Sequence, residues 1–350
     1  MRLAVYGPYR RLGAVQDNEI IDLSAAYAKY LAETRDEPLP YEMAAAVVPA
    51  DLDAFILSGD RAIEGAARAL EHLSSRASDR RGVKGERLVE PLADVKLHAP
   101  YARRCRIMMA GGNYAVHSQG MSGRGPSGER MSLEEVYRAA RQRGIWGFYC
   151  FPENAAGPGE DISYPARTDR LDYEGEVAVI LGKRGKDIAA DRAEAYYWGY
   201  MLQNDISART TLPSPDNPQS GFTRSKNFDA SVAGGPFIVV GEFPDAQNIG
   251  WETRVNGELR QQGNTKDMTF SFAEFVEYLS ADMVLLPGDV ISAGTTAGTA
   301  QDSSAIIPGS AGPSGQPLRD PKLFLKPGDV VEVSNPAMGT LRNRIVAKAG

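Results

Sequence analysis

The chain has 350 residues, 43% hydrophobic and 24% charged, which is the composition of an ordinary soluble globular protein with room for two domains. A net charge of −6 and a pI near 5.3 argue against nucleic acid as the main partner. No apolar stretch approaches the roughly 18 residues of a membrane span, so no membrane association is expected. The two cysteines, Cys105 and Cys150, and the lack of a signal peptide's apolar core predict a cytoplasmic protein.

The N-terminal quarter of the sequence predicts a small α+β domain over residues 1–90. Apolar alternation with turn residues between the runs predicts a hairpin of short strands at 2–6, 12–15 and 19–22. Residues 23–75 carry helical spacing, clearest at 62–73. The polar, basic stretch 74–86 is typical of a linker to a second domain at 91–350.

From residue 98 onward, many short strands separated by Gly and Pro predict a β-rich domain, so the chain as a whole is expected to be mainly β with peripheral helices. Two insertions interrupt it. Residues 118–146 hold a Gly/Ser-rich run at 122–128 and then a helix at 132–143 that begins with the capping box Ser132 to Glu135. Residues 299–320 are rich in Ser, Gly, Pro and Ala and predict a flexible segment.

Two glutamates, Glu174 and Glu176, stand at the head of the apolar run 177–181, which predicts a buried strand. Alternation along a strand points both side chains the same way, with Cα atoms about 7 Å apart. Gly175 between them allows close approach on the opposite face. The run 200–205 ends in Asp205, a natural third oxygen ligand. Three carboxylates favour Mg²⁺, Mn²⁺ or Ca²⁺ over zinc, although such a pair also occurs on the solvated face of an antiparallel strand.

Several further segments follow one another in a fixed order between residues 98 and 347: 112–117, 172–176, 204–209, 225–229, 255–258, 286–295, 326–329 and 338–343. In residue types and order they resemble the motifs of the fumarylacetoacetate hydrolase family. The resemblance implies a mixed β-sandwich or roll as the catalytic domain, a small N-terminal domain and a homodimer. The segment 270–275, with three phenylalanines, offers apolar surface for such a dimer unless it faces inward.

The same resemblance implies roles for individual residues. Glu174, Glu176 and Asp205 would hold the metal ion, His117 would be the general base, and Lys226 would place its ammonium beside the metal. Tyr114, Arg209 and Thr295 would bind substrate. The alternatives are structural: Lys226 as a surface residue paired with Asp229, Arg209 in an ion pair with a surface acid, and Thr295 as part of a turn of small residues.

One position departs from the family pattern. Several members carry a glutamate three residues after this histidine, and here that residue is Gly120. A histidine without an acidic partner loses control of its tautomer. Glu129, Glu134 or Glu135 from the insertion is predicted to supply the carboxylate; without one, decarboxylation or tautomerisation becomes the better interpretation than hydrolysis.

The implied activity is metal-assisted hydrolysis of a carbon–carbon bond in a 1,3-diketo or 2-oxo acid of the acylpyruvate or fumarylpyruvate type, as in aromatic-compound catabolism. Decarboxylation or isomerisation of an unsaturated 2-oxo-dioic acid would use the same site. A non-catalytic module is a third hypothesis, and it predicts a closed metal shell with His117 and Lys226 turned away. An acid- or sugar-binding protein is disfavoured without a signal peptide. Neither a phosphate-binding glycine loop nor a Gly-x-Ser-x-Gly nucleophile is present in the sequence.

Overall fold

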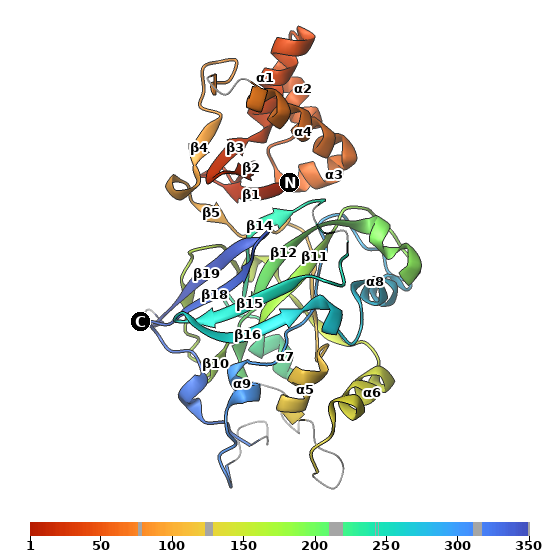
Figure 1. The fold of residues 1–350 in the computed structure, drawn as a ribbon, viewed down its shortest axis with the longest axis vertical. Helices are drawn as coiled ribbons and strands as arrows, with labels where there is room; N and C mark the ends of the chain where they lie inside the picture. Colours follow the sequence, from red (N-terminus) through yellow and green to blue (C-terminus); the bar gives the residue numbers. More distant parts are fainter. Residues whose placement is uncertain are drawn as a thin grey trace.

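The computed structural model describes residues 1–75, 79–122, 129–209, 220–241, 243, 245–310 and 317–348 (Figure 1). Within them, twelve strands form one mixed sheet whose main path is β4-β3-β2-β1-β14-β12-β11-β17-β6-β7, with β5 on β1 and β8 on β14. Its strands are β1 Arg2–Tyr6, β2 Arg11–Gln16, β3 Glu19–Asp22, β4 Val89–Pro91, β5 Leu97–His98, β6 Ile107–Ala110, β7 Gly147–Cys150, β8 Ala155–Ala156, β11 Gly175–Leu181, β12 Tyr197–Asp205, β14 Val232–Val239 and β17 Val290–Ser292.

The N-terminal part confirms the predicted short strands and helices. Four helices, α1 Leu23–Arg35, α2 Pro40–Val47, α3 Leu52–Ser58 and α4 Asp60–Ser75, gather at one end of the molecule beside β1 to β4 (Figure 1). Strand β1 pairs antiparallel with β14, placing Leu3 opposite Ile238, so the large sheet runs without a break from these strands into the rest of the chain. A domain boundary near residue 90 stays a prediction.

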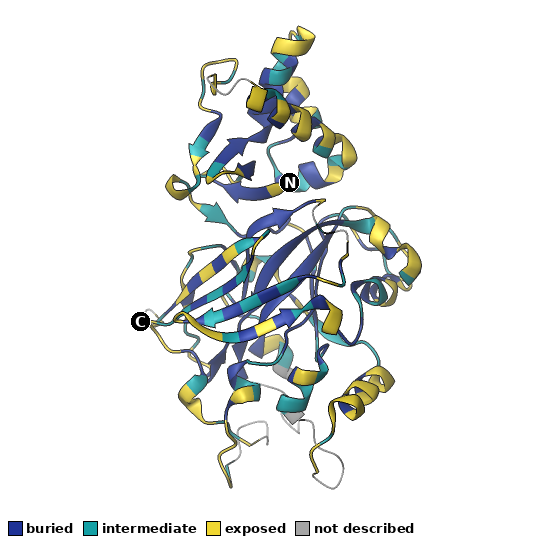
Figure 2. Cartoon of the chain, viewed as in Figure 1, coloured by how far each residue is buried: buried dark blue, intermediate teal, exposed yellow. Residues whose placement is uncertain are grey.

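A second sheet covers the middle of the first. It has the order β16-β15-β18-β19-β9, with β9 Ile162–Ser163, β15 Gly250–Val255, β16 Glu258–Asn264, β18 Val330–Asn335 and β19 Gly339–Val346. Trp251 and Val333 of this sheet share a buried core with Val177 and Leu202 of the large sheet. Figure 2 shows the central strands of the large sheet buried, whereas the strands of the second sheet alternate between buried and more exposed residues and the outer faces of the helices are exposed. The fold is therefore mainly β with peripheral helices, as predicted.

The two sheets approach each other closely at Gly175. A Cβ atom there would lie 2.0 Å from Thr253 Oγ1, a distance that no side chain tolerates, and the Trp251 indole donates to the Gly175 carbonyl oxygen at 3.0 Å. The prediction that this glycine permits a close approach behind the two glutamates is confirmed.

The two insertions lie together at the end of the sheets that is far from α1 to α4 (Figure 1). The first contains α5 Ala115–Ser122 and α6 Leu133–Arg143, and the predicted capping box between Ser132 and Glu135 is present. The second contains α9 Ala300–Ser303. Arg319 joins them, because its guanidinium donates to the carbonyl oxygens of Gly120, Met121 and Ser304. Most of the Gly/Ser-rich run, at 123–128, and residues 311–316 lie outside the described residues.

The segment 270–275 does not supply apolar surface. Helix α8, Phe272–Ser280, turns Phe272 and Phe275 into the core, where they are 0% and 1% exposed, and Phe270 is also buried. The apolar spacing of this segment serves the core of the same chain, so this argument for a dimer is wrong. Among the described residues no helix combines the length and apolarity needed to cross a membrane.

The remaining elements are small. They are β10 Leu171–Asp172 paired with β13 Ser207–Ala208, α7 Ser220–Ser225, and short 3₁₀ turns at Leu92–Asp94, Pro152–Asn154, Ala190–Tyr196, Thr265–Asp267 and Pro321–Leu323.

Candidate metal centre and active site

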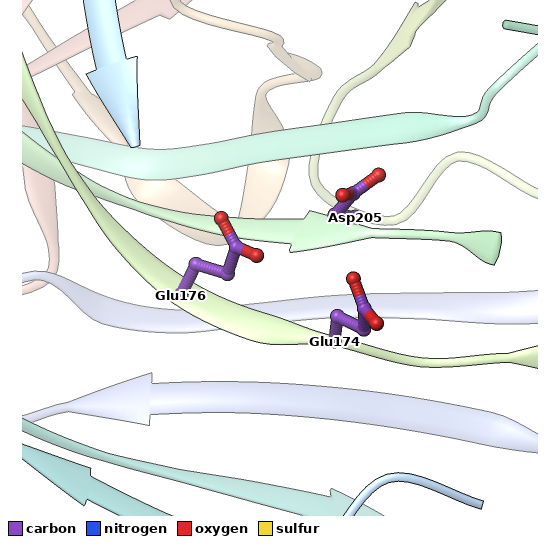
Figure 3. Close-up of side chains that lie close together, drawn as sticks. All are labelled: Glu174, Glu176 and Asp205. Carbon is purple, nitrogen blue, oxygen red and sulfur yellow. The ribbon is translucent and has the colours of Figure 1, made fainter. Parts of the chain in front are cut away.

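Three carboxylates meet where β11 begins and the neighbouring β12 ends. These strands pair antiparallel, with Gly175 opposite Asn204. Glu174 and Glu176 flank Gly175 on one strand, and Asp205 directly follows Asn204 on the other. The Asp205 backbone N–H donates to the Glu174 carbonyl oxygen at 2.9 Å. All three side chains are buried, and one oxygen from each lies within 4.8 Å of the others (Figure 3). The alternation rule therefore placed the pair correctly, and the strand register brings in the third acid.

Lys226 lies among these carboxylates. Its ammonium donates to Glu174 Oε2 and to Asp205 Oδ2, each at 2.7 Å, and to Ser207 Oγ. The side chain is buried, at 2% exposure, on the segment that follows α7. The alternative of a surface lysine paired with Asp229 does not describe this geometry. Lys226 instead lies where its ammonium neutralises the charge of Glu174 and Asp205.

Arg209 reaches the same cluster from the other side. Its guanidinium donates to Asp172 Oδ2 at 2.8 Å and forms a short hydrogen bond with Glu174. Asp172 also accepts the backbone N–H groups at the start of α9. Among the residues that the structure describes, Glu176 has no cationic partner of this kind, and it accepts a short hydrogen bond from the Ser292 hydroxyl. Charge is thus distributed unevenly within this part of the chain, since Arg209 and Lys226 both contact Glu174.

The pKa directions follow this uneven distribution. Burial alone would raise the pKa of Glu174, but Arg209 and Lys226 lower it well below its usual range. Burial, with the neighbouring carboxylates Asp205 and Glu174, raises the pKa of Glu176 well above its usual range. Burial also raises the pKa of Asp205 to about 7, although Lys226 opposes the shift. Two of the three acids therefore lack enough positive charge to ionise readily at neutral pH.

These residues fit a hard divalent cation. Asp205 Oδ1 is buried and has no hydrogen-bond partner among the described residues, although an oxygen in that position normally has one. Oxygen donors from three buried carboxylates, with no sulfur and no histidine among them, are the set that Mg²⁺ and Mn²⁺ accept. A cation between Glu174, Glu176 and Asp205 would supply the charge that Glu176 and Asp205 lack.

His117 forms a hydrogen-bonded pair with Asp302. On α5, its Nδ1 lies 2.7 Å from Asp302 Oδ2, and its Nε2 lies 4.0 Å from Glu174 Oε1. Burial would raise the pKa of Asp302, but the hydrogen bond from His117 lowers it, which favours the carboxylate. With Asp302 ionised, the imidazole carries its proton on Nδ1 and presents the Nε2 lone pair toward the carboxylate cluster. This is the arrangement of a general base with a fixed tautomer.

Asp302 corrects the prediction of an acidic partner from the first insertion. Glu135 closes the capping box with Ser132, Glu134 lies 3.5 Å from the exposed Arg138, and Glu129 is exposed, so none of the three glutamates meets the imidazole. The carboxylate comes from the second insertion, and the absence of a side chain at Gly120 leaves room for Asp302 beside α5. A Cβ at Gly120 would lie 2.7 Å from Asp302 Cβ.

A local signal for Asp302 exists in the sequence. Thr299 is the N-cap residue of α9, and its hydroxyl accepts a hydrogen bond from the Asp302 backbone N–H. A threonine in this position is a typical helix start, here inside a segment whose composition predicts flexibility. That signal predicts an ordered turn, but it does not predict which side chain the turn delivers to a histidine 185 residues away.

The three predicted substrate-binding residues are occupied by other contacts or buried. Arg209 is held by Asp172 and Glu174, as described above. The Thr295 hydroxyl donates to the Gly175 carbonyl oxygen at 3.0 Å and accepts from Gln261. Tyr114 is 1% exposed and packs edge-on against Trp251 in the core, and its hydroxyl has no hydrogen-bond partner in the described part of the chain. A substrate role for each of them stays a prediction.

Comparisons with known proteins identify the family of this chain. Residues 106–346 match the family model of the fumarylacetoacetate (FAA) hydrolase C-terminal region. The oxaloacetate tautomerase YisK of Bacillus subtilis is 31% identical over 335 residues, which cover 95% of this chain and 94% of that protein. The structure of a 2-hydroxyhepta-2,4-diene-1,7-dioate isomerase from Mycobacterium marinum has a TM-score of 0.55 at 29% identity, covering 75% of this chain and 82% of its own.

A fumarylacetoacetate hydrolase from psychrophilic Exiguobacterium antarcticum has a TM-score of 0.66 at 25% identity, covering 99% of this chain and 100% of its own. These relatives are named as a tautomerase, an isomerase and a hydrolase, so proteins with this fold carry names for several different reactions. The family match over more than half of the chain, together with the full-length likeness to a relative, leads to one conclusion: this chain belongs to the fumarylacetoacetate hydrolase family.

Proposed function

We propose that this protein is a divalent-metal-dependent hydrolase that cleaves a carbon–carbon bond in an acylpyruvate-type 1,3-diketo or 2-oxo acid. The observation that carries the proposal is the His117–Asp302 pair, whose free Nε2 faces the carboxylate cluster. Hydrolysis needs a base that removes a proton from water, and an imidazole with a fixed tautomer beside the site supplies it. Without such a pair, a reaction that does not use water would be the better proposal.

In the proposed reaction His117 Nε2 takes a proton from water while the oxygen adds to the carbonyl carbon remote from the carboxylate. The bond between that carbonyl carbon and the next carbon then breaks, and its electron pair forms the enolate of a 2-oxo acid. Mg²⁺ or Mn²⁺ bound by Glu174, Glu176 and Asp205 would supply Lewis acidity toward the oxo-acid oxygens. Lys226 places an ammonium charge at the same cluster and favours the negative charge of the enolate. Protonation of the enolate carbon gives the smaller oxo acid, and the other product is a carboxylic acid.

A keto–enol tautomerase is the second candidate. It is favoured by the likeness to the oxaloacetate tautomerase of Bacillus subtilis over 95% of this chain. In that reaction His117 would move a proton between carbon and the enol oxygen, and no bond between carbons would break. The non-catalytic hypothesis is disfavoured, because it predicts His117 and Lys226 turned away from the acids, and both lie against Glu174.

The test is a panel of acylpyruvates and 2-oxo-dioic acids assayed with and without Mg²⁺ or Mn²⁺, with products identified by NMR. The proposal expects metal-dependent release of pyruvate or a related oxo acid together with a carboxylic acid. His117→Ala should lower kcat by roughly 10²-fold or more at nearly unchanged metal affinity. His72→Ala, which changes a histidine of α4 paired with Glu33, is the matched control and should be neutral. Interconversion of keto and enol forms without cleavage on every substrate would replace the hydrolase with the tautomerase.

We also propose that the protein acts as a homodimer, on the ground of its family membership alone. Light scattering that gives only the single-chain mass across micromolar concentrations would contradict this.

A further inference from the structure

Asp172 is a buried acid that the proposed reaction does not use. It lies on β10, two residues before Glu174, and is 0% exposed. Withdrawing a carboxylate from water in this way is costly unless several hydrogen-bond donors meet it. The donors that Asp172 receives come from three separate segments of the chain, so its side chain joins those segments.

Each oxygen of Asp172 accepts one backbone N–H from the start of α9. Oδ1 accepts the Ala300 N–H at 2.7 Å, and Oδ2 accepts the Gln301 N–H at 3.1 Å. Oδ1 also accepts the Tyr173 N–H at 2.9 Å, and Oδ2 also accepts the Nε–H of Arg209 at 2.8 Å. The first N–H groups of a helix have no acceptor within that helix, so the carboxylate satisfies two of them. Asp172 therefore fixes the place where α9 begins.

The single turn of α9 carries the acidic partner of His117. Thr299 is its N-cap, and the Asp302 backbone N–H donates to the Thr299 hydroxyl. Asp302 Oδ1 accepts the Gly298 N–H, and Oδ2 meets the imidazole. A helix that spans only Ala300–Ser303 cannot keep its own shape, because isolated helices shorter than about 12 residues are marginal in water. The position of Asp302 thus depends on contacts from outside the helix.

The same carboxylate is joined to the candidate metal ligands through Arg209. The Arg209 guanidinium donates to Asp172 Oδ2 and forms a short hydrogen bond with Glu174. Strand β10 pairs with β13 and sets Asp172 opposite Ser207, which is two residues before Arg209. The residue that holds α9 therefore belongs to the short segment that also carries Glu174. The second insertion is in this way held against the strand of the metal centre.

Resting on the proposed role of the His117–Asp302 pair, we propose that Asp172 is a positioning residue for the reaction. It holds the start of α9 so that Asp302 meets the imidazole, and it joins this contact to Glu174 through Arg209. Asparagine cannot replace it, because an amide has only one oxygen. In either orientation, the amide NH₂ would face N–H groups that a carboxylate oxygen accepts now, so one N–H of α9 would lose its acceptor.

Hydrogen exchange on the full chain tests this role without any substrate. The reporters are the Ser303 and Ser304 amides, whose acceptors are the carbonyl oxygens of Thr299 and Ala300 rather than Asp172. Both amides should be protected in the wild-type protein. Asp172→Asn should speed their exchange by roughly 10- to 100-fold, the equivalent of one charge-assisted hydrogen bond. Unprotected exchange in the wild type, or unchanged protection in the variant, would overturn the proposal.

Asp289→Asn is the matched control. Asp289 is also buried, at 3% exposure, and its carboxylate accepts from the Arg106 guanidinium and from the Leu286 backbone N–H. The change removes the same charge from a similar arrangement that does not include α9, so both reporter amides should keep their protection. An equal loss of protection in this control would trace the effect to general destabilisation and overturn the proposal. Asp172→Ser, which is smaller and keeps one acceptor oxygen, takes the place of an asparagine variant that does not fold, with the same expected loss.

A double-mutant cycle tests the route by which Asp172 acts. At saturating Mg²⁺, Asp172→Asn should lower kcat by roughly 10- to 100-fold, as expected when a catalytic pair is displaced. In the Asp302→Asn background the same change should lower kcat by less than about threefold, because the contact that it maintains is already lost. Additive losses would overturn the proposal, since a merely structural role affects both backgrounds alike. The expected exchange result in a protein that cleaves no substrate would overturn the hydrolase and support the role of Asp172 in holding α9.

Discussion

Replacing Asp302 with asparagine isolates the contact that the proposed mechanism needs. In the structure Asp302 Oδ1 accepts the Gly298 backbone N–H at 3.0 Å and the Ser303 hydroxyl at 2.7 Å, while Oδ2 alone meets His117. An asparagine that keeps its oxygen in the Oδ1 position retains both structural bonds and the fit beside Gly120. Only the group facing the imidazole changes, from an acceptor to a donor.

That inversion should move the proton of the imidazole. An amide N–H facing Nδ1 requires Nδ1 to accept, so the proton moves to Nε2, the atom that faces the cluster. The base is then blocked without being removed, and kcat should fall by roughly 10²- to 10⁴-fold, the range that general-base catalysis contributes. The substrate KM and the metal affinity should change by less than about threefold, because Asp302 touches neither the three acids nor Lys226.

The assay is steady-state kinetics on the substrate that the panel identifies, with the metal-induced rise in Tm measured on the same samples. Ser303→Ala is the control, since it removes one hydrogen bond from Asp302 and leaves the one to His117. A kcat for Asp302→Asn within about threefold of wild type would refute the role of the pair in orienting the base. A severe loss in Ser303→Ala as well would show that the integrity of α9, and not the tautomer, is what matters.

Three further outcomes are expected. Glu176→Gln and Asp205→Asn should each remove the metal-dependent part of Tm and of activity, since each deletes one of three anionic ligands; unchanged Mg²⁺ affinity by calorimetry would exclude these ligands. Because the pKa of Asp205 is raised to about 7 and that of Glu176 is also raised, a cation must displace protons when it binds. Metal affinity should therefore increase as pH rises through 7. Calorimetry in buffers of different ionisation enthalpy should detect the released protons. Gly175→Ala should lower the free energy of unfolding, measured with urea, by roughly 1–3 kcal/mol or more, because the added methyl overlaps Thr253. Combining it with Thr253→Ala should recover part of the lost stability. An unchanged stability of the single variant would contradict the close approach of the sheets.

The common direction of Glu174 and Glu176, two of the candidate metal ligands, could be predicted from the sequence because their pattern is local. Strand alternation fixes the common direction of Glu174 and Glu176, and a glycine between them is explained by the neighbouring sheet. The capping box of α6 is likewise a pattern of four consecutive residues, and it is present as predicted. Such features depend on backbone geometry over a few residues, which composition and spacing describe well.

The acidic partner of His117 could not be predicted in this way. His117 lies just before the first insertion and Asp302 lies in the second, 185 residues further along the chain, and Arg319 helps to hold the two insertions together. The segment 270–275 shows the opposite error, since three phenylalanines read as surface are needed by the core of the same chain. In both cases contacts between segments far apart in the sequence determine where the side chains lie. The periodicity of a single segment does not predict such contacts.

In the proposed reaction, water activated by His117 cleaves a carbon–carbon bond. The sharpest test is cleavage of the identified substrate in water enriched in ¹⁸O, with mass spectrometry of the carboxylic acid product after a short reaction. One ¹⁸O atom is expected in that acid for each bond broken, at a rate that falls roughly 10²-fold or more in His117→Ala. Deuterium exchange or keto–enol interconversion without any labelled acid would contradict it and would assign the site to tautomerisation.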